Sequence, residues 1–294
     1  MTLTCPPLSI VSVTGQDAEK ILSNLTTNKI ADATEDVAVE TFVTEVRGRC
    51  VGHVMVIRFE DGFRLVGSAG QSEAIAALVD RYTIREDALA TAEDDRWAGG
   101  FVAPTEDATT PGFRLPGFRV SVPWLGPPQD LFLTPKQDTD LKQDTDPNPD
   151  PAGAPPADPT DFHDQRVAAG FPWHGVDFGD RNLPQEADRT DQAISFTKGC
   201  YLGQETVARL DALGKVQKQL VRIELAASLP TLQPDDKVML EGKPIARITS
   251  VHSGGGIVIA MARRGFLDAG AEIAGPLESS DPSIDGTPFQ GVVR

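Results

Sequence analysis

The apolar residues near the N-terminus recur with the period of a helix. Residues 14–25 place apolar side chains at i, i+3, i+4 and i+7, which predicts a helix with one buried face. That face consists of Ala18, Ile21, Leu22 and Leu25. Thr14 is expected to cap the helix, with Asp17 three residues further on.

A second helix and several strands follow. Residues 72–82 repeat the helical period, and the buried side of this helix is expected to consist of Ile75, Leu78, Val79 and Tyr82. Between the two helices, residues 37–46 and 51–59 are rich in β-branched side chains, and Asp61-Gly62 turns the chain into a third strand at 63–66. Helices mixed with hairpin strands predict an α+β domain rather than a doubly wound sheet.

From residue 218 onward the pattern is that of β-structure throughout. Short strands are predicted at residues 220–225, 237–240, 245–251 and 257–260. Turn residues separate them, among them Glu241-Gly242 and Gly254-Gly255-Gly256. This spacing predicts a small barrel or sandwich of about 75 residues.

Residues 127–160 differ in kind from the segments on either side. The sequence Lys-Gln-Asp-Thr-Asp occurs at 136–140 and again at 142–146, and a run of prolines follows it. Such a segment has too little apolar surface to offset its ordering entropy, so we predict a disordered, Asp/Pro-rich insertion. An acidic docking tail is the alternative, and nothing else in the sequence supports it.

The overall charge narrows the classes of partner. A net charge of −16 and a pI near 4.6 argue against binding to nucleic acid or to an anionic membrane, because both attract basic surfaces. The N-terminus lacks the features of a signal peptide, and no apolar run reaches the roughly 20 residues of a membrane helix. Cys5, Cys50 and Cys200 form no CxxC pair, which favours a reducing compartment and predicts a cytoplasmic protein.

Cys200 is the cysteine whose neighbours are suited to tune it. Lys198 lies two residues before it, and a helix is expected to begin near Gly203. A nearby ammonium and a helix N-terminus both favour thiolate over thiol, which predicts a reactive side chain. A lone cysteine is more often a small buried apolar residue, so on physical grounds alone a structural role stays open. A cysteine hydrolase lacks support, since no histidine lies nearby in the sequence.

The same segment resembles a known family. Residues 198–209, Lys-Gly-Cys-Tyr-Leu-Gly-Gln-Glu-Thr-Val-Ala-Arg, are similar to the K-G-C-[YF]-x-G-Q-E-x-[VT]-A-R signature of YgfZ-type proteins, which are relatives of the glycine-cleavage T-protein. Further stretches that resemble the family are Leu25-Thr26-Thr27-Asn28, Arg47-Gly48-Arg49, Gly170-Phe171-Pro172, Pro184-Gln185-Glu186-Ala187, Thr249-Ser250 and Pro288-Phe289. The resemblance covers nearly the whole chain outside the predicted insertion.

The resemblance implies two α+β lobes around a folate-sized hole and a C-terminal β-barrel. The predicted organisation is an N-terminal lobe at 1–126, the insertion at 127–160, a second lobe segment at 161–215 and the barrel at 216–294. The resemblance also implies binding of tetrahydrofolate or another reduced folate, and a part in the assembly or repair of iron–sulfur clusters. The implied partners are therefore a reduced folate and iron–sulfur enzymes or assembly factors.

The resemblance also assigns the site residues. Cys200 is the expected functional thiol, with Lys198 beside it. The residues expected to contact folate are Thr27, Asn28, Arg47, Glu186, Tyr201, Gln204 and Glu205. No metal ligand is assigned. Glu186 either pairs with the amino edge of a pterin, as a carboxylate does well, or is an exposed charge in a turn.

Two departures from the T-protein pattern bear on activity. The T-protein turn leads into a pair of aspartates, whereas this chain has Gly52-His53 there and no carboxylate in residues 50–53. The T-protein glutamate ahead of its G-x-P element is replaced by Ala168-Ala169. Transfer of a one-carbon unit needs proton handling by such an acid. His53 is an alternative proton carrier, although its expected place in a strand favours a packed or solvent-facing histidine.

These departures determine which of three functional hypotheses is favoured. The leading one is a tetrahydrofolate-binding protein that assists iron–sulfur cluster assembly or repair without aminomethyl transfer. The alternative is a tetrahydrofolate-dependent aminomethyltransferase, against which the missing aspartates argue. A third is a scaffold for an iron–sulfur enzyme that has lost folate altogether.

Overall fold

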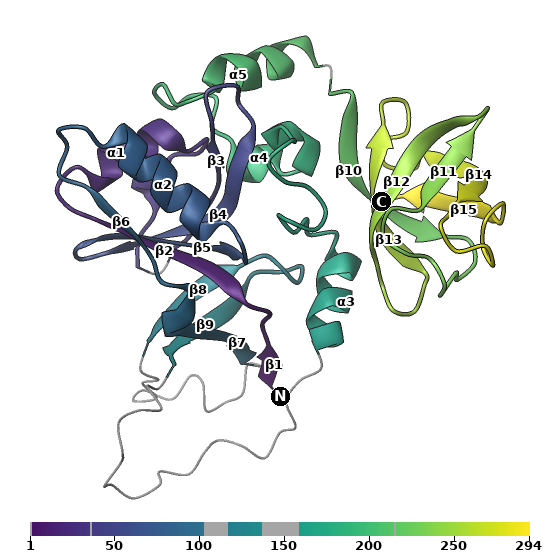
Figure 1. The fold of residues 1–294 in the computed structure, drawn as a ribbon, viewed down its shortest axis with the longest axis horizontal. Coiled ribbons are helices and arrows are strands. Elements are labelled where there is room, and N and C mark those ends of the chain that lie inside the picture. Colours follow the sequence, from purple (N-terminus) through teal and green to yellow (C-terminus); the bar gives the residue numbers. More distant parts are fainter. Residues whose placement is uncertain (1, 36, 103–116, 137–158, 215) are drawn as a thin grey trace, which may run out of the picture.

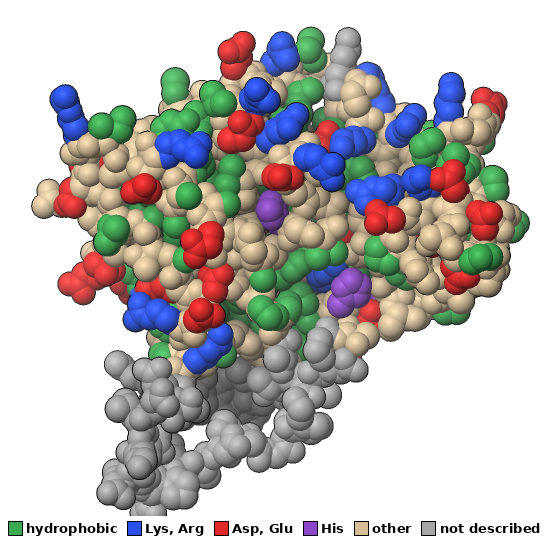
Figure 2. Space-filling model, in the orientation of Figure 1, with side chains coloured by type: hydrophobic (Ala, Val, Ile, Leu, Met, Phe, Trp, Pro, Cys, Tyr) green, Lys and Arg blue, Asp and Glu red, His purple; other side chains and the backbone are tan. Residues whose placement is uncertain are grey.

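The computed structural model describes residues 2–35, 37–102, 117–136, 159–214 and 216–294, which form two open sheets and a closed barrel (Figure 1). The two sheets and the barrel lie at opposite ends of the long axis, with α3 (Pro159–Ala169), α4 (Thr190–Ala193) and α5 (Gln204–Leu213) between or above them. In the same view, acidic side chains are spread over the surface, whereas Lys and Arg gather toward its upper right part (Figure 2). No helix in the described ranges is long and apolar enough to cross a membrane.

The first sheet has five strands in the order β3-β4-β5-β2-β6. Their bounds are Val39–Thr44, Cys50–Phe59, Gly62–Ser68, Leu8–Thr14 and Leu89–Ala92. Helices α1 (Ala18–Leu25) and α2 (Ser72–Tyr82) bury their apolar faces against it, so both predicted helices are confirmed.

Two details of these helices differ from prediction. Thr14 does not cap α1, because it ends β2, where it pairs with Gly62, and α1 begins only at Ala18. Tyr82 is not part of the buried side of α2, since it is 39% exposed at the last residue of the helix. Both errors lie at element ends, where periodicity is least informative.

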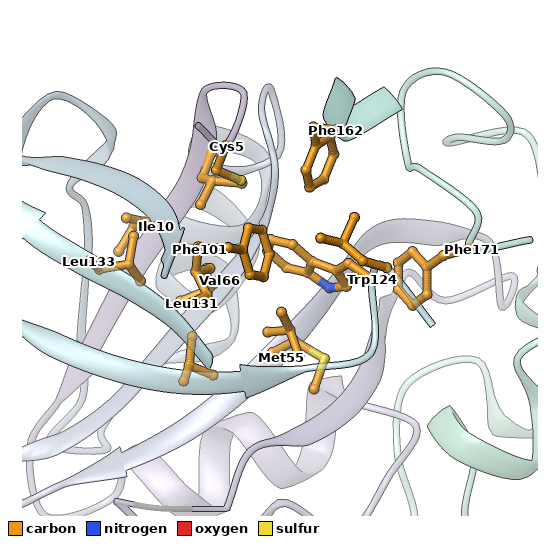
Figure 3. Packing of buried hydrophobic residues seen from close by; sticks show 14 of the residues in the cluster. Cys5, Ile10, Met55, Val66, Phe101, Trp124, Leu131, Leu133, Phe162 and Phe171 are labelled. Atoms are coloured by element: carbon orange, nitrogen blue, oxygen red, sulfur yellow. The ribbon is translucent and has the colours of Figure 1, made fainter. Parts of the chain in front are cut away.

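The second sheet has four strands in the order β1-β7-β9-β8. Their bounds are Thr2–Thr4, Trp97–Val102, Gln129–Pro135 and Phe118–Val122. It packs on the first sheet through an aromatic core in which Trp124 lies between Phe101, Phe162 and Phe171 (Figure 3). Short 3-10 turns η1 (Ile30–Asp32) and η2 (Asp94–Arg96) complete this part of the chain.

Strand β9 corrects the predicted start of the insertion. The insertion was expected to begin at residue 127, but Leu131 and Leu133 of β9 are fully buried in the aromatic core. Leu131 and Leu133 alternate onto the buried face of β9, and this short pattern was the signal that the prediction did not use. At the other end, α3 begins at Pro159. Residues 137–158, with most of the repeat and its prolines, lie outside the described residues.

The barrel closes in the order β10-β13-β12-β11-β14-β15. The bounds are Lys218–Leu225, Ile257–Arg263, Lys243–Val251, Lys237–Leu240, Glu272–Glu278 and Pro288–Val293. The first four contain the predicted strands, and β14 and β15 supply the remainder of the closed wall. The fold is therefore α+β with a C-terminal six-stranded antiparallel barrel.

A buried ion pair joins the barrel to the rest of the molecule. Arg166 of α3 donates to Asp177 at 2.8 Å, and both side chains are almost fully buried. Asp177 also accepts the hydroxyls of Thr249 at 2.7 Å and Ser250 at 2.6 Å, both on β12. The Thr-Ser pair noted in the sequence thus serves as the attachment of the barrel.

Candidate functional site

Lys198 anchors the cysteine loop to the end of α1. Its ammonium donates to the carbonyls of Ser23 at 2.9 Å, Thr26 at 2.7 Å and Asn28 at 2.7 Å. The last carbonyls of a helix lack partners within the helix, and a cation there is favourable. Burial lowers the pKa of Lys198 to about 8. All three of its N–H donors serve these carbonyls, so its first role is to hold the loop.

The anchored loop presents Cys200 to solvent. The amide of Leu202 donates to Asn24 at 2.8 Å, and the hydroxyl of Thr44 donates to the Leu202 carbonyl at 2.6 Å. Cys200 is exposed, whereas Cys5 and Cys50 are buried. Burial raises the pKa of the Cys5 and Cys50 thiols. The loop therefore holds the exposed cysteine on a backbone fixed from two sides.

Gly203 ends this loop and begins α5, as predicted. Its φ of 81° lies in the left-handed region, and a Cβ there would approach Gly48 Cα and the Glu45 carbonyl oxygen to 2.5 Å. A side chain does not fit at that distance. The glycines of the two sequence motifs thus bring the β3–β4 turn against the start of α5.

Most of the predicted folate contacts are used within the protein. Thr27 is fully buried and donates to the Ala193 carbonyl at 2.7 Å. The amide of Asn28 donates to the carbonyls of Glu40 at 2.9 Å and Gln192 at 2.8 Å. These two residues bind the end of α1 to β3 and α4, and their side-chain polar atoms are used within the protein.

The other predicted contacts lie in separate places. Arg47 and Glu205 are exposed and Gln204 is half-buried, all near the β3–β4 turn and the start of α5. Glu186 accepts from Asn182 at 2.6 Å and pairs with Lys218 at 3.4 Å.

Tyr201 is enclosed in the apolar core beneath the cysteine loop, and burial raises its pKa to about 12. Its hydroxyl has no hydrogen-bond partner among the described residues. None of the seven residues predicted to contact folate lines the open cleft at Arg189, which is described below.

A buried network of charged side chains, which the sequence did not predict, lies around His53, where the T-protein pattern has an aspartate. Glu40 of β3 accepts from His53 Nε2 at 2.8 Å and from two nitrogens of Arg189 at 2.8 and 2.6 Å. Burial alone would raise the pKa of Glu40, but the hydrogen bonds from Arg189 and His53 outweigh it and hold the pKa at about 2. A single charged residue in the buried, otherwise uncharged segment 39–44 was the available signal.

His53 is a packed histidine, as the sequence favoured. Its ring stacks on Phe42 at 4.6 Å and on Phe171 at 5.7 Å between ring centres. A small cavity of about 10 Å³, which is room for one water, lies beside it and is also lined by Trp124 and His174. Burial lowers the pKa of His174 to about 4, so this ring is neutral at physiological pH.

An open polar cleft lies on the other side of the Arg189 side chain. Its volume is about 480 Å³. The lining residues include Gly170, Asp188, Arg189, Gln192, Gln219, Arg222 and Arg294. The Nε of Arg222 is buried there without a partner among the described residues. Since Arg189 also lies over the Phe171 ring at 5.0 Å, the cleft and the His53 network are adjacent.

The sequence is similar to those of several known proteins. No family model matches the chain. It is 26% identical over 246 residues to the tRNA-modifying protein YgfZ of Sodalis glossinidius, covering 78% of this chain and 72% of that protein. A stretch of 73 residues is 40% identical to YgfZ of Colwellia psychrerythraea, which is 24% of this chain and 22% of that relative. A mitochondrial iron-sulfur cluster assembly factor IBA57 homolog of Pyricularia oryzae is 26% identical over 234 residues, 72% of this chain and 54% of that protein.

The fold is also similar to that of a known protein. The glycine cleavage system aminomethyltransferase T of Bartonella henselae superposes with a TM-score of 0.75 over 100% of this chain and 84% of that chain. Its 15% identity establishes the shared fold alone. The sequence matches, which cover 72 to 78% of the chain, and the shared fold make the chain similar to the YgfZ/IBA57 family.

Proposed function

We propose that this protein assists the assembly or repair of iron–sulfur clusters, binds a reduced folate and does not transfer aminomethyl groups. Relatives at about the same similarity are named as tRNA-modifying proteins or as iron-sulfur cluster assembly factors. The observation that carries the proposal is the exposed Cys200 on an anchored loop. The compartment we propose is the cytoplasm, although relatives include both bacterial and mitochondrial proteins.

The thiolate acts as a transient ligand to iron in this proposal. Iron–sulfur clusters are usually held by four protein ligands, and Cys200 supplies one. Within the described residues, no three His, Cys, Asp or Glu side chains gather as metal ligands would. A single exposed thiolate suits a step in which iron is handed to, or received from, another protein, with one iron–sulfur bond to Cys200 formed and then broken.

The open cleft supports binding of a folate. Its volume of about 480 Å³ lies within the usual range for small-ligand sites, which is roughly 300–1,000 Å³. Arg222 and Arg294 both pair with Glu224 at 2.9 Å. They would exchange this partner for the carboxylates of the folate tail, since a guanidinium binds carboxylate in a fork. Asp188 is a better candidate than Glu186 for the amino edge of the pterin, because Asp188 lines the cleft and Glu186 does not, although Asp188 accepts from Gln219.

The network around Glu40 argues against aminomethyl transfer. It brings a carboxylate to His53, the position that matches a T-protein aspartate. With a pKa held at about 2, however, this carboxylate remains ionised at neutral pH and is a weak base. Arg189 and His53 occupy its oxygens. The purified protein should therefore form no methylene-tetrahydrofolate from tetrahydrofolate and an aminomethyl-loaded lipoyl carrier.

The test of the cysteine is rescue in cells that lack this protein. Wild type should restore the activities of iron–sulfur enzymes, whereas Cys200→Ser should fail. Thr197→Ala is the matched control, because it alters an exposed residue of the same loop and leaves the thiol in place. Full rescue by Cys200→Ser would reject the proposed role of the thiol.

The folate site is tested separately by calorimetry with tetrahydrofolate. Arg222→Ala should weaken binding by about tenfold or more, as expected for loss of a charged hydrogen bond. Arg247→Ala changes a half-buried arginine of the barrel that lies outside the cleft and should leave the affinity unchanged. Equal affinities in the two variants would place the folate elsewhere.

A further inference from the structure

A carboxylate of the protein itself bridges two arginines of the open cleft. Glu224 of β10 accepts from Arg222 Nη2 with its Oε1 at 2.9 Å, and from Arg294 Nε with its Oε2 at 2.9 Å. Both arginines line the cleft, whereas Glu224 does not. The bridge therefore shows that one carboxylate can bind both guanidinium groups at once.

Contacts other than this bridge hold both arginines in place. The stem of Arg222 lies against Gly170, where a Cβ would approach the Arg222 Cδ to 3.2 Å and its Cβ to 3.3 Å. The amide of Arg294 donates to the Arg222 carbonyl at 2.9 Å, so the chain after β15 lies beside β10 (Figure 1). The stem of Arg222 and the backbone of Arg294 thus keep their positions without Glu224.

The bridge leaves one donor of Arg222 unused. The Nε of Arg222 is buried and has no hydrogen-bond partner among the described residues. In a guanidinium, Nε–H and one N–H of Nη2 point the same way and can bind the two oxygens of one carboxylate. Glu224 reaches only Nη2. Because a buried donor without a partner costs free energy, a carboxylate that pairs with both nitrogens would bind Arg222 better than Glu224 does.

We propose that Glu224 competes with the ligand for the two arginines and that the carboxylates of the folate tail displace it. This inference rests on the proposed folate site in the cleft. The Glu224 side chain is 41% exposed, so it can turn to solvent when it is displaced. A ligand with one carboxylate only replaces Glu224 one for one, whereas a dicarboxylate supplies one group to each arginine. Glu224 therefore favours dicarboxylates.

The alternative role for Glu224 is to hold the two arginines ready for the ligand. Loss of its charge would then weaken binding, which is the opposite of what competition predicts. Exposed ion pairs stabilise a side-chain geometry only weakly. The contact with Gly170 and the hydrogen bond to the Arg222 carbonyl remain when Glu224 is changed. These contacts favour competition.

The first experiment is calorimetry with glutarate, a dicarboxylate that carries no pterin. Glu224→Gln should bind glutarate about three- to tenfold more tightly than wild type, a range set by the weakness of the two exposed ion pairs that are lost. The matched control, Glu60→Gln, makes the same change of charge at an exposed glutamate outside the cleft and should alter the affinity less than about twofold. Equal or weaker binding in Glu224→Gln, an equal gain in the control, or no binding of glutarate to Glu224→Gln would overturn the proposal.

The second experiment repeats the titration with tetrahydrofolate and separates this inference from the folate site itself. Glu224→Gln should again bind more tightly, and the gain should shrink when Arg222→Ala is combined with it, because the two residues act on the same carboxylate. A gain with glutarate but no binding of tetrahydrofolate to any variant would reject the folate site and leave the competition by Glu224 standing. Binding of tetrahydrofolate that Arg222→Ala weakens but Glu224→Gln does not strengthen would reject the competition and leave the folate site standing.

Discussion

The molecule contains two buried charge networks that differ in what surrounds them. Asp177 is enclosed on all sides. Its carboxylate oxygens accept hydrogen bonds from Arg166, Thr249, Ser250 and the Trp173 amide. Glu40 is equally buried, but its partner Arg189 has a side chain 18% exposed and lines the open cleft. The first network therefore only joins parts of the fold, whereas the second connects a cleft to the interior of a sheet. Burial of the carboxylate alone does not distinguish these two roles. The exposure of the arginine side chain that pairs with it does.

The largest effect should come from Asp177→Asn. The change leaves the buried Arg166 guanidinium without its counter-charge, and breaking such a pair costs about 3–5 kcal/mol. Urea unfolding measures the free energy. Asp180→Asn, at an exposed neighbour, should change it by less than about 0.5 kcal/mol. A loss below about 1 kcal/mol in Asp177→Asn would mean that the junction does not depend on the ion pair.

Glu40→Gln should follow, at about 2–3 kcal/mol, because solvent can still reach Arg189 after its partner is lost. The variant should also alter the dependence of stability on pH. The folded-state pKa of Glu40 is depressed from 4.5 to about 2, so its contribution is present above pH 4.5 and disappears as the pH falls toward 2. Unfolding between pH 5 and 2 should therefore be less steep in the variant, and identical slopes would count against the network.

Arg189→Lys should have a smaller effect, about 1–2 kcal/mol, since the charge remains while the fork of two hydrogen bonds is lost. Thermal unfolding of this variant compares the cleft network with the sealed one. The corresponding change at Arg166, Arg166→Lys, should cost more, because Arg166 has no access to solvent. Equal costs would remove the distinction between the two networks.

The smallest effect is expected for Thr249→Val, which removes one of the hydroxyls that Asp177 accepts. A buried hydrogen bond of this kind contributes about 1 kcal/mol, and Ser250 still serves the same oxygen. Chemical unfolding should detect the loss without a change in the barrel, as judged by circular dichroism. A cost as large as that of Asp177→Asn would show that the hydroxyls, not the guanidinium, hold the carboxylate.

Local patterns predicted the parts of this fold that local contacts determine. The α2 span agrees with prediction because its apolar face lies at regular spacing, and α5 begins where the glycine motif indicated. Strands β2 and β9 were not predicted, although both bury alternate or consecutive apolar residues. In β9 the polar neighbours and the nearby repeat masked two fully buried leucines.

The candidate site was less predictable because its partners are distant in the chain. Glu40 and Arg189 are 149 residues apart, and no periodicity relates them. The motif did identify Cys200 and Lys198, but only the fold shows that the ammonium serves the carbonyls at the end of α1. Motifs marked which residues matter, and tertiary contacts decide what each side chain binds.

The contact between Gly48 and Gly203 has a kinetic consequence. Because the β3–β4 turn and the start of α5 touch backbone to backbone, this turn lies directly beside the end of the Cys200 loop. A protein held at this turn would meet the thiol in an intramolecular step, at an effective concentration on the order of millimolar. Transfer of iron to or from Cys200 could then be rapid even in a complex that is weak and short-lived. Each partner would leave as soon as this transfer is complete.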